Sequence, residues 1–400
     1  MPVGAEDRLI GLIRAGLPPA QTIGVALSGG GDSLALLHLT LRVGFAVEAV
    51  TVDHRLRAES TDEAAKVATD CAALGVRHEV RVWQHGTVQG NLMDAARQAR
   101  LGLIAGWARE RGIGVVALGH TRDDQAETVL MGLARAGGLA GLSGMRASWE
   151  DDGVRFCRPL LAAGREELRD WLRGRGIAWI DDPTNDNERF TRTRARRALA
   201  ALAPLGITAE RLTEVAGHLA EAQAAVAAQV AGVAGRLVRE EAGALLIDAG
   251  LWDEPVEVRR QLVRAAMIWL AGSEGVPRAA DLSRLMAAMA EGRDATLSGC
   301  RFRKGWLMRE PRAVGGPVAL GQLWDGRWQV KGAAGEVRVL GVEGLPLCPD
   351  WRATGLPREV LLVTPGLWQG DQLLAAPLAG FLGGAEARIE RSFHLFGLSH

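Results

Sequence analysis

One stretch of the sequence decides the fold: Ile23-Gly24-Val25-Ala26-Leu27-Ser28-Gly29-Gly30-Gly31-Asp32-Ser33-Leu34-Ala35-Leu36-Leu37. It begins with a short apolar run, which predicts a buried strand, passes through three glycines, and ends in an apolar run typical of a helix. The free N–H groups at a helix N-terminus and the helix dipole favour an anion, and glycines let a phosphate come close to the backbone. The sequence therefore predicts a phosphate site between a strand and a helix.

The polar residues of this stretch refine the prediction. Ser28 and Ser33 can donate hydroxyl hydrogen bonds, whereas the carboxylate of Asp32 would repel a phosphate. Asp32 suits the site when Mg²⁺ lies between the two groups, because Mg²⁺ prefers carboxylate and phosphate oxygens. The common phosphate loop G-x-x-x-x-G-K-S/T and the dinucleotide motif G-x-G-x-x-G are both absent. The alternative is a glycine-rich turn in which Asp32 or Ser33 only caps the helix.

The composition fits a globular chain of two or three domains. The 400 residues carry a formal net charge of +0, so only local clusters can attract a polyanion. The four cysteines are scattered, without the spacing that would indicate zinc, an iron–sulfur cluster or a disulfide framework. No signal-peptide pattern and no run of about 18 apolar residues is present. We expect a soluble protein of the reducing cytoplasm that does not enter a membrane.

Strand and helix patterns alternate after the glycine stretch. Because such alternation forms a parallel sheet with right-handed crossovers, the sequence predicts an α/β fold. Ligands of these sheets bind at the carboxyl ends of the strands. Three polar segments should therefore meet there: 28–33, Asp53-His54 and His120–Glu127. Further strands are expected at 45–52, 78–83 and 114–118, and helices at 61–74, 91–111, from near Asp123, and at 165–173.

The second half of the chain has a different pattern. Helical patterns at 209–239, 256–271 and 279–291 predict a separate helical domain, whereas 296–308 alternates like a strand. The tail has glycine-rich turns and short strand patterns, which are typical of a small mixed domain. The predicted domains are an α/β domain at 1–204, a mainly helical domain at 205–317 and a small mixed α/β domain at 318–400.

A second polar segment, Gly119-His120-Thr121-Arg122-Asp123-Asp124-Gln125-Ala126-Glu127-Thr128, opens a predicted helix. Asp124 and Glu127 are three residues apart, so their side chains lie on the same face of that helix. Two carboxylates on one face can hold a metal ion, bind an ammonium group or accept a proton. The alternative is that they only complement the helix dipole, with Thr121 as the cap.

Together these motifs resemble those of a known family. The Ser-Gly-Gly-x-Asp-Ser pattern at 28–33 resembles the pyrophosphate loop (PP-loop) of ATP pyrophosphatases, which split ATP between its α- and β-phosphates and adenylate a substrate. The segments 120–128 and 135–145 resemble the tRNA(Ile)-lysidine synthetase family, and the resemblance is dense over about 22–197 and thin beyond 200. It departs at Leu101, where the family usually has Tyr, and at Ala136-Gly137, where Gly and Ser are common. Further matching segments are 52–57, 91–100, 158–161 and 182–194.

The resemblance implies an adenine-nucleotide α-hydrolase-like PP-loop ATPase domain and a two-step reaction. ATP would adenylate the wobble cytidine (position 34) of an isoleucine tRNA with a CAU anticodon, activating C2 and releasing pyrophosphate. The ε-amine of free L-lysine would then attack C2, release AMP and give lysidine. Since free lysine is an ammonium with a pKa of roughly 10.4, it must lose a proton before it attacks.

The resemblance also implies roles for single residues. Asp124 and Glu127 would bind the lysine ammonium and help to remove its proton. Arg97 would stabilise phosphate charge as pyrophosphate leaves, unless it is only a surface arginine. The residues implied to bind ATP are Ser28, Gly29, Gly30, Gly31, Asp32, Ser33 and His54, with Asp32 as the ligand of Mg²⁺.

Two basic clusters are candidates for binding the tRNA backbone. The stronger cluster lies between the α/β domain and the helical domain, which is predicted to bind tRNA as well. The alternative for this cluster is a solvated helix start, and the weaker cluster is equally compatible with an exposed strand. The stronger cluster comprises Arg189, Arg192, Arg194, Arg196 and Arg197, and the weaker one comprises Arg301, Arg303, Lys304, Arg309 and Arg312.

Three other functions fit parts of the sequence. A tRNA thiolase would usually need paired cysteines, which this chain lacks, and a GMP- or asparagine-synthetase relative would need a glutaminase unit or supplied ammonia. A non-catalytic tRNA-binding protein would not need Asp32, Asp124 and Glu127. The sequence leaves the oligomeric state open, with a homodimer as one alternative.

Overall fold

The computed structural model describes residues 4–55, 60–84, 92–180, 191–272 and 277–396. The chain divides into two compact units, Met1–Gln223 and Ala224–His400. The division falls inside the long helix α9 (Ala209–Leu237) and differs from the boundaries at 204/205 and 317/318 that the sequence predicts. Because α9 continues through the division, no interruption of the helical pattern marks it in the sequence.

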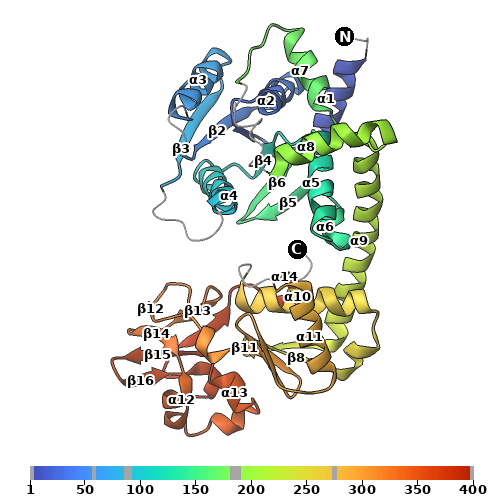
Figure 1. Cartoon of the computed structure of the whole chain (residues 1–400). Coiled ribbons are helices and arrows are strands. Elements are labelled where there is room, and N and C mark those ends of the chain that lie inside the picture. Colours follow the sequence, from blue (N-terminus) through green and yellow to red (C-terminus); the bar gives the residue numbers. More distant parts are fainter. Residues whose placement is uncertain (1–3, 56–59, 85–91, 181–190, 273–276, 397–400) are drawn as a thin grey trace. The chain divides into compact units, whose positions relative to one another are not determined.

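The first unit is built around a six-stranded sheet with the strand order β3-β2-β1-β4-β6-β5 (Figure 1). Ile23 of the central strand is paired with Val47 on one side and Val115 on the other, and both pairings are parallel. Only the edge strand β5 runs antiparallel to its neighbour. The predicted α/β fold class with a parallel sheet is confirmed. The strands are β1 (Ile23–Leu27), β2 (Val47–Asp53), β3 (Arg77–Val82), β4 (Val115–Leu118), β5 (Ser148–Asp151) and β6 (Val154–Cys157).

Helices cover both faces of this sheet. Since successive residues of a strand point to opposite faces, Val25 packs into the core with α1, α2, α3 and α7, whereas Ala26 packs with α4. Trp171 of α7 and Trp107 of α4 are fully buried in these two layers. The helices are α1 (Ala5–Gly16), α2 (Gly31–Val43), α3 (Ser60–Ala73), α4 (Leu92–Glu110), α5 (Arg122–Ala134), α6 (Leu139–Leu142), α7 (Arg165–Arg173) and α8 (Thr191–Leu202).

The order of the strands positions the functional residues. β1, β4 and β6 lie side by side in the sheet, and the next helices along the chain after them are α2, α5 and α7. Because the three strands are parallel, the N-termini of these three helices meet at the carboxyl edge of the sheet. Polar side chains in the first turns of α2, α5 and α7 are thereby brought together from distant parts of the sequence.

The second unit contains more strands than the sequence predicts. A five-stranded sheet, with the order β7-β8-β11-β10-β9, packs against α10 and α11, although most of this region is predicted to be helical. β7 and β8 form a hairpin too short to show a strand period, with Ala242 and Gly243 at positive φ in its turn. The elements are β7 (Val238–Glu241), β8 (Ala244–Ile247), α10 (Val256–Ala271), α11 (Ala279–Ala290), β9 (Ala295–Leu297), β10 (Cys300–Arg303) and β11 (Trp306–Arg309).

The rest of the second unit is a mixed region of short strands and helices, as the sequence predicts for the tail. One sheet has the order β12-β14-β15-β16, and a separate antiparallel pair joins β13 to β17. The elements are β12 (Val318–Ala319), β13 (Trp328–Lys331), β14 (Glu336–Val339), α12 (Gly341–Gly344), α13 (Arg358–Leu361), β15 (Pro365–Gln369), β16 (Gln372–Ala375), β17 (Glu386–Ile389) and α14 (Phe393–Phe396).

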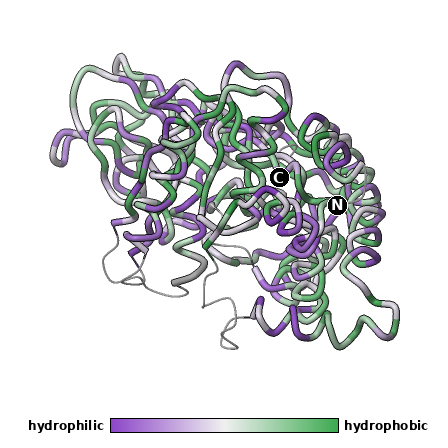
Figure 2. The backbone as a smooth tube through the Cα atoms, turned by 90° about the horizontal axis from the view of Figure 1, so that it is seen from above, coloured by the Kyte–Doolittle hydropathy of each residue, from purple (hydrophilic) through white to green (hydrophobic). Residues whose placement is uncertain are grey.

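Hydropathy varies along the helices in the way expected for a globular chain. Figure 2 shows that hydrophobic and hydrophilic residues are mixed along the backbone of both units. None of the helices in the described ranges is long and apolar enough to cross a membrane.

Candidate functional site

The glycine stretch forms the loop between β1 and α2 that the sequence predicts. The hydroxyl of Ser33 donates to the carbonyl of Gly30 (2.9 Å) and accepts from the N–H of Ser28 (3.2 Å), so the loop is held by its own serines. Gly30 is the N-cap residue of α2 and supplies no side-chain cap. Asp32 and Ser33 lie inside the helix, so the capping alternative does not describe this turn. The loop therefore has the strand, glycine turn and helix N-terminus of an anion site.

The loop also touches the segment that follows α7. The N–H of Ile180 donates to the carbonyl of Gly29 (3.0 Å). Gly29 has a φ of 79°, and a Cβ atom there would lie 2.8 Å from Cδ1 of Ile180. A Cβ at Gly31 would meet the ring of Trp179 at 3.4 Å. Gly29 thus serves a positive φ, and both glycines leave room for the side chains of the segment that follows α7.

Three carboxylates meet at one guanidinium at the carboxyl edge of the sheet. Arg165, the first residue of α7, donates from Nε to Asp32 (3.2 Å), from Nη1 to Glu127 (3.3 Å) and from Nη2 to Asp124 (2.9 Å). Asp32 comes from α2, and Asp124 and Glu127 come from α5, so three strand–helix units contribute. The expected convergence of 28–33 with 120–127 is therefore observed, with Arg165 as an additional member.

Burial makes this cluster electrostatically unusual. Glu127 has 0% of its surface exposed and Asp124 has 7%. Burial raises the pKa of Asp32 to about 6, an effect that Arg165 opposes and the nearby charge of Asp124 reinforces. Burial acts in the same direction on Asp124, but Arg165 and the backbone N–H of Thr121 outweigh it and hold the pKa of Asp124 below its usual value.

Two carboxylate oxygens of the cluster have no hydrogen-bond donor among the described residues. Oδ1 of Asp32 and Oε2 of Glu127 are buried and accept no hydrogen bond from any described residue. A buried anionic oxygen without a donor is costly, so these atoms favour a cationic or hydrogen-bonding ligand. The arrangement can hold a cation beside a phosphate, which is the combination that the sequence predicts.

Asp124 combines both roles that the sequence leaves open. Its Oδ2 accepts from the N–H (2.8 Å) and the hydroxyl (3.0 Å) of Thr121, so it completes a capping box at the start of α5. Its Oδ1 faces Arg165 instead. The capping box therefore fixes the orientation of Oδ2, and Oδ1 remains part of the carboxylate cluster.

A neutral histidine lies next to this cluster. Nδ1 of His120 accepts from Nε of Arg158 (3.1 Å), and the Arg158 guanidinium is stacked 4.1 Å above the ring of Trp149. Burial, reinforced by the charge of Arg158, lowers the pKa of His120 to about 3. Since Nδ1 is an acceptor, the proton of the neutral ring is on Nε2, which remains available as a donor.

Arg97 and the arginines of the stronger basic cluster differ in their burial and in their contacts. Arg97 and Arg192 both lower the pKa of Arg158, so they belong to the positive side of the site. Arg196 donates from Nε to Oε1 of Glu127 (2.5 Å) and reaches the carboxylate cluster directly. Arg194 is exposed and its guanidinium contacts the hydroxyl of Thr191. Arg197 is exposed as well, and Arg189 lies outside the described residues.

The strand end of β2 does not reach the carboxylate cluster. Asp53 accepts from the backbone N–H of Arg55 (2.9 Å) and from the hydroxyls of Ser60 (2.7 Å) and Thr61 (3.2 Å), so its oxygens are engaged by the first residues of α3 and by Arg55. His54 lies edge-on against the ring of Trp83 at 5.8 Å. The role of His54 in ATP binding stays a prediction.

Sequence reasoning missed Arg165, the residue that joins the cluster. Two signals were available for it. Arg165 begins the helix that follows β6, and β6 ends at the same edge of the sheet as β1 and β4. A cation in the first turn also opposes the helix dipole, which suggests that a partner outside the helix holds it there.

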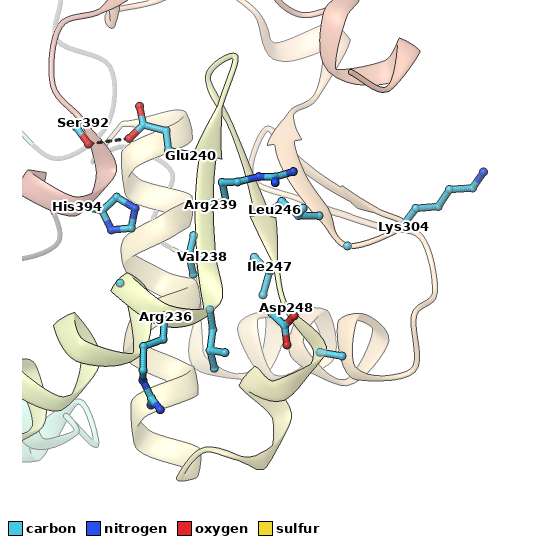
Figure 3. Close-up of a pocket in the computed structure, with 14 residues that line it drawn as sticks. Arg236, Val238, Arg239, Glu240, Leu246, Ile247, Asp248, Lys304, Ser392 and His394 are labelled. Atoms are coloured by element: carbon cyan, nitrogen blue, oxygen red, sulfur yellow. Dashed lines mark hydrogen bonds between the residues drawn. The ribbon is translucent and has the colours of Figure 1, made fainter. Parts of the chain in front are cut away.

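A cavity of about 890 Å³ in the second unit offers no comparable chemistry (Figure 3). Its acidic residues are engaged in the fold, because Glu240 accepts from Ser392 (2.8 Å) and Asp248 from the N–H of Gly250 (2.8 Å). Its arginines Arg236 and Arg239 are paired with glutamates. The carboxylate cluster at the sheet edge is therefore the stronger candidate for catalysis.

The cysteines and the grouping of potential metal ligands can be described separately from the carboxylate cluster. The four cysteines Cys71, Cys157, Cys300 and Cys348 are buried and form no disulfide. Within the described ranges, no group of three or more His, Cys, Asp or Glu side chains is arranged to hold a metal ion unaided. The thiolase alternative therefore gains no cysteine pair from the fold.

The chain is similar to known proteins over part or all of its length. A family model described as a PP-loop domain matches residues 5–203. A tRNA(Ile)-lysidine synthase of Ruegeria pomeroyi is 44% identical over 420 residues, covering 100% of this chain and 99% of that protein. One of Brucella suis biovar 1 is 34% identical, covering 95% of this chain and 91% of that protein. Among solved structures, the U34-tRNA thiolase NcsA of Methanococcus maripaludis is 17% identical with a TM-score of 0.47, covering 54% of this chain and 79% of that chain.

Proposed function

The chain belongs to the tRNA(Ile)-lysidine synthase family, with a PP-loop domain that uses ATP, and from this premise we propose how its residues form lysidine on tRNA(Ile). In the first step, O2 of the wobble cytidine attacks the α-phosphorus of ATP, and pyrophosphate leaves. In the second step, the ε-nitrogen of free L-lysine attacks C2, and the C2–O2 bond breaks as AMP leaves with that oxygen. The lysine ammonium loses a proton before it attacks.

The glycine loop is proposed to hold the phosphates of ATP. The N-cap residue of α2 is Gly30, so no side chain of that residue caps the N–H groups of the first turn. Hydrogen bonds of Ser28 and Ser33 fix the shape of the loop. Asp32 fits a ligand of Mg²⁺, because its buried Oδ1 lacks a donor among the described residues and one carboxylate oxygen plus phosphate oxygens suits that ion. Mg²⁺ bound there would neutralise phosphate charge. Ser28–Ser33 supply the remaining donors, and Arg97 would contact pyrophosphate as it leaves.

Asp124 and Glu127 are proposed to receive the ε-ammonium of lysine. The observation that carries this proposal is the buried Oε2 of Glu127, which has no donor in the described part of the chain. An ammonium provides three donors and a positive charge, and a carboxylate within hydrogen-bond reach can take its proton. His120 supplies an N–H donor near Asp124, and Arg158 with its neighbouring arginines adds positive charge.

The tRNA is proposed to enter past the N-terminal turns of α8. The cytidine belongs to a single-stranded loop with the CAU anticodon, so it can be splayed into the site without melting a duplex. Arg192 and Arg196 lie within or beside the site, whereas Arg194 and Arg197 are exposed on the same helix and can contact the phosphate backbone. Arg189 and the weaker cluster around Arg301 remain candidates for further contacts.

One experiment tests the proposed function. A CAU-anticodon isoleucine tRNA is incubated with the enzyme, ATP, Mg²⁺ and lysine, and the modified nucleoside is analysed by mass spectrometry. We expect the mass of lysidine, AMP in equal amount, and tRNA-dependent exchange of pyrophosphate into ATP without lysine. Exchange without any gain of lysine mass would leave adenylation intact and refute lysine as the nucleophile.

The cellular compartment and the oligomeric state of the enzyme are also proposals. Four buried, unpaired cysteines fit a reducing compartment such as the cytoplasm. A homodimer stays a prediction, which light scattering of the purified protein tests.

A further inference from the structure

The carboxylate cluster contains its own cation. Arg165 uses three different nitrogen atoms for three different carboxylates, which belong to α2 and α5. Its side chain is 15% exposed, and the three acids, led by Asp124, raise its pKa despite its burial. The guanidinium is planar and its N–H groups form a rigid fork, so it sets the distances between its acceptors.

The backbone fixes this guanidinium in place. The N–H of Arg165 donates to Oδ2 of Asp123 (2.7 Å), and the N–H of Arg122 donates to the carbonyl of Ala163 (2.9 Å). These two bonds join the first turns of α5 and α7 at the residues next to the cluster. The side chain of Arg165 therefore starts from a fixed point relative to Asp124.

The two arginines that contact the cluster do not neutralise its three carboxylates. Asp32, Asp124 and Glu127 carry three negative charges when ionised, and Arg165 and Arg196 supply two positive charges. The oxygens without donors, Oδ1 of Asp32 and Oε2 of Glu127, are not the atoms that Arg165 contacts. An added cation can bind beside Arg165 without displacing it.

We propose that Arg165 is the positioning residue of the lysine-transfer step. Its guanidinium holds Asp124 and Glu127 at the separation that receives the ε-ammonium, and it links both to Asp32 on the phosphate side. The inference rests on the proposed function of these carboxylates. When the guanidinium is removed, the ammonium of lysine enters the vacated position, where the three carboxylates bind it but its nitrogen is displaced from C2 of the adenylated base.

The test compares Arg165→Ala with Arg173→Ala. Arg173 lies on the same helix, is half exposed and pairs with Asp170 and Glu166. Its guanidinium lies 5.8 Å from the ring of Trp179 but makes no ion pair with the three carboxylates among the described residues, so it serves as the control. For Arg165→Ala we expect kcat of lysine transfer to fall by about 10- to 100-fold, the size expected from a misplaced reactant. The KM for lysine should stay level or fall, because binding in the vacated position is tight and unproductive. Arg173→Ala should match the parent enzyme.

Chemical rescue separates positioning from a general structural role. Added methylguanidinium should refill the position in Arg165→Ala and restore most of kcat, whereas sodium chloride at equal ionic strength should not. Calorimetry should show a methylguanidinium site in Arg165→Ala that the parent lacks. If Arg165→Ala does not fold, Arg165→Lys keeps a cation on α7, and it should show the same loss of kcat because a compact ammonium does not set the distances between its acceptors as the planar guanidinium does.

Three results would overturn the inference. A raised KM for lysine with an unchanged kcat would mean that Arg165 contacts the substrate itself. A folded Arg165→Ala with the activity of the parent, or one that is inactive and neither binds nor responds to methylguanidinium, would remove the positioning role. Failure of the proposed function has a different signature, since the parent enzyme would then form no lysidine, while the calorimetry still reports on the guanidinium position.

Discussion

Gly119 and Ser33 lie so close that no other residue type fits at position 119: a Cβ atom there would be 2.9 Å from Cα of Ser33 and 3.0 Å from its nitrogen. The atoms that it would meet are backbone atoms in the first turn of α2, which cannot rotate away. Gly119 follows β4, and Ser33 belongs to the helix after β1, so this approach sets how close α5 comes to the glycine loop.

We expect Gly119→Ala to separate these two segments. The clash should lower stability by about 1–3 kcal/mol, the usual range for overpacking, and weaken ATP binding by moving α2. Thermal unfolding and nucleotide binding measure the two effects. Gly102→Ala is the control, because its Cβ would meet nothing within 4 Å and alanine favours a helix. An ATP affinity equal to that of the parent would contradict the prediction.

Asp32→Asn should stabilise the protein without ligands while abolishing adenylation. The pKa of Asp32 is raised to about 6, so ionisation costs stability, and that cost appears as the pH rises from the ordinary value of 3.8 through 6. At pH 8 we expect the melting temperature of the first unit to rise by about 2 °C or more, and near pH 4 to stay level. Thermal scans at both pH values measure this, and a fall at pH 8 would show that the charge is stabilising.

His120 should remain neutral throughout the physiological range. Its pKa is lowered to about 3, so its contribution to stability is complete above the ordinary value of 6.5 and is lost as the pH falls from 6.5 towards 3. Nitrogen NMR of labelled histidine should show the Nε2–H tautomer and no titration between about pH 5 and 8. The signal is identified by its loss in His120→Gln, and a midpoint near 6.5 would be incompatible with the site described.

Glu127→Gln should affect lysine more than ATP. The substitution keeps the shape of the side chain but removes the charge that faces Arg165 and Arg196. We expect the lysine concentration needed for half-maximal transfer to rise by at least about tenfold, since a charged hydrogen bond is lost. Pyrophosphate exchange in the absence of lysine should change much less. Equal losses in both assays would assign Glu127 to adenylation instead.

Arg192 and Arg194 should behave differently, although they are neighbours in one basic cluster. Arg194→Ala should weaken tRNA binding and reduce its salt dependence by about one ion, because the side chain is exposed. Arg192→Ala should also slow catalysis, because the charge of Arg192 acts on Arg158 and His120 inside the site. Salt titrations of tRNA binding, with single-turnover rates, distinguish the two. Identical effects of both variants would argue against this division.

The sequence predicts the first unit well because its signals are local. The strands around Val25 are short apolar runs, and parallel pairing brings the polar residues after them together without further information. The position of Asp124 opposite Asp32 follows from the neighbouring places of β1 and β4. The sequence alone therefore predicts that these two motifs, which are far apart in the chain, lie close together in the fold.

Other features depend on contacts that leave little trace in a single sequence. Asp53 has the same placement after a strand as the other polar segments, yet local donors from Ser60 and Thr61 draw it into a turn. The hairpin of β7 and β8 is too short for its period to show, and it is stabilised by packing between distant segments such as Leu245 and Leu307. Arg165 resembles any other arginine of an amphipathic helix until its distant partners are known.

The ion pair between Arg165 and Asp32 joins residues 133 positions apart in the chain. Contacts of such separation form late, because the intervening chain must be ordered before they can be made. A chain still emerging from the ribosome presents the glycine loop long before it can present α7. By the end of that interval the nascent chain has all three carboxylates of the cluster but not the residue that aligns them. Recovery of lysine transfer during refolding should therefore lag behind formation of the strands around β1, and the enzyme acquires its full chemistry only when the sheet is complete out to β6.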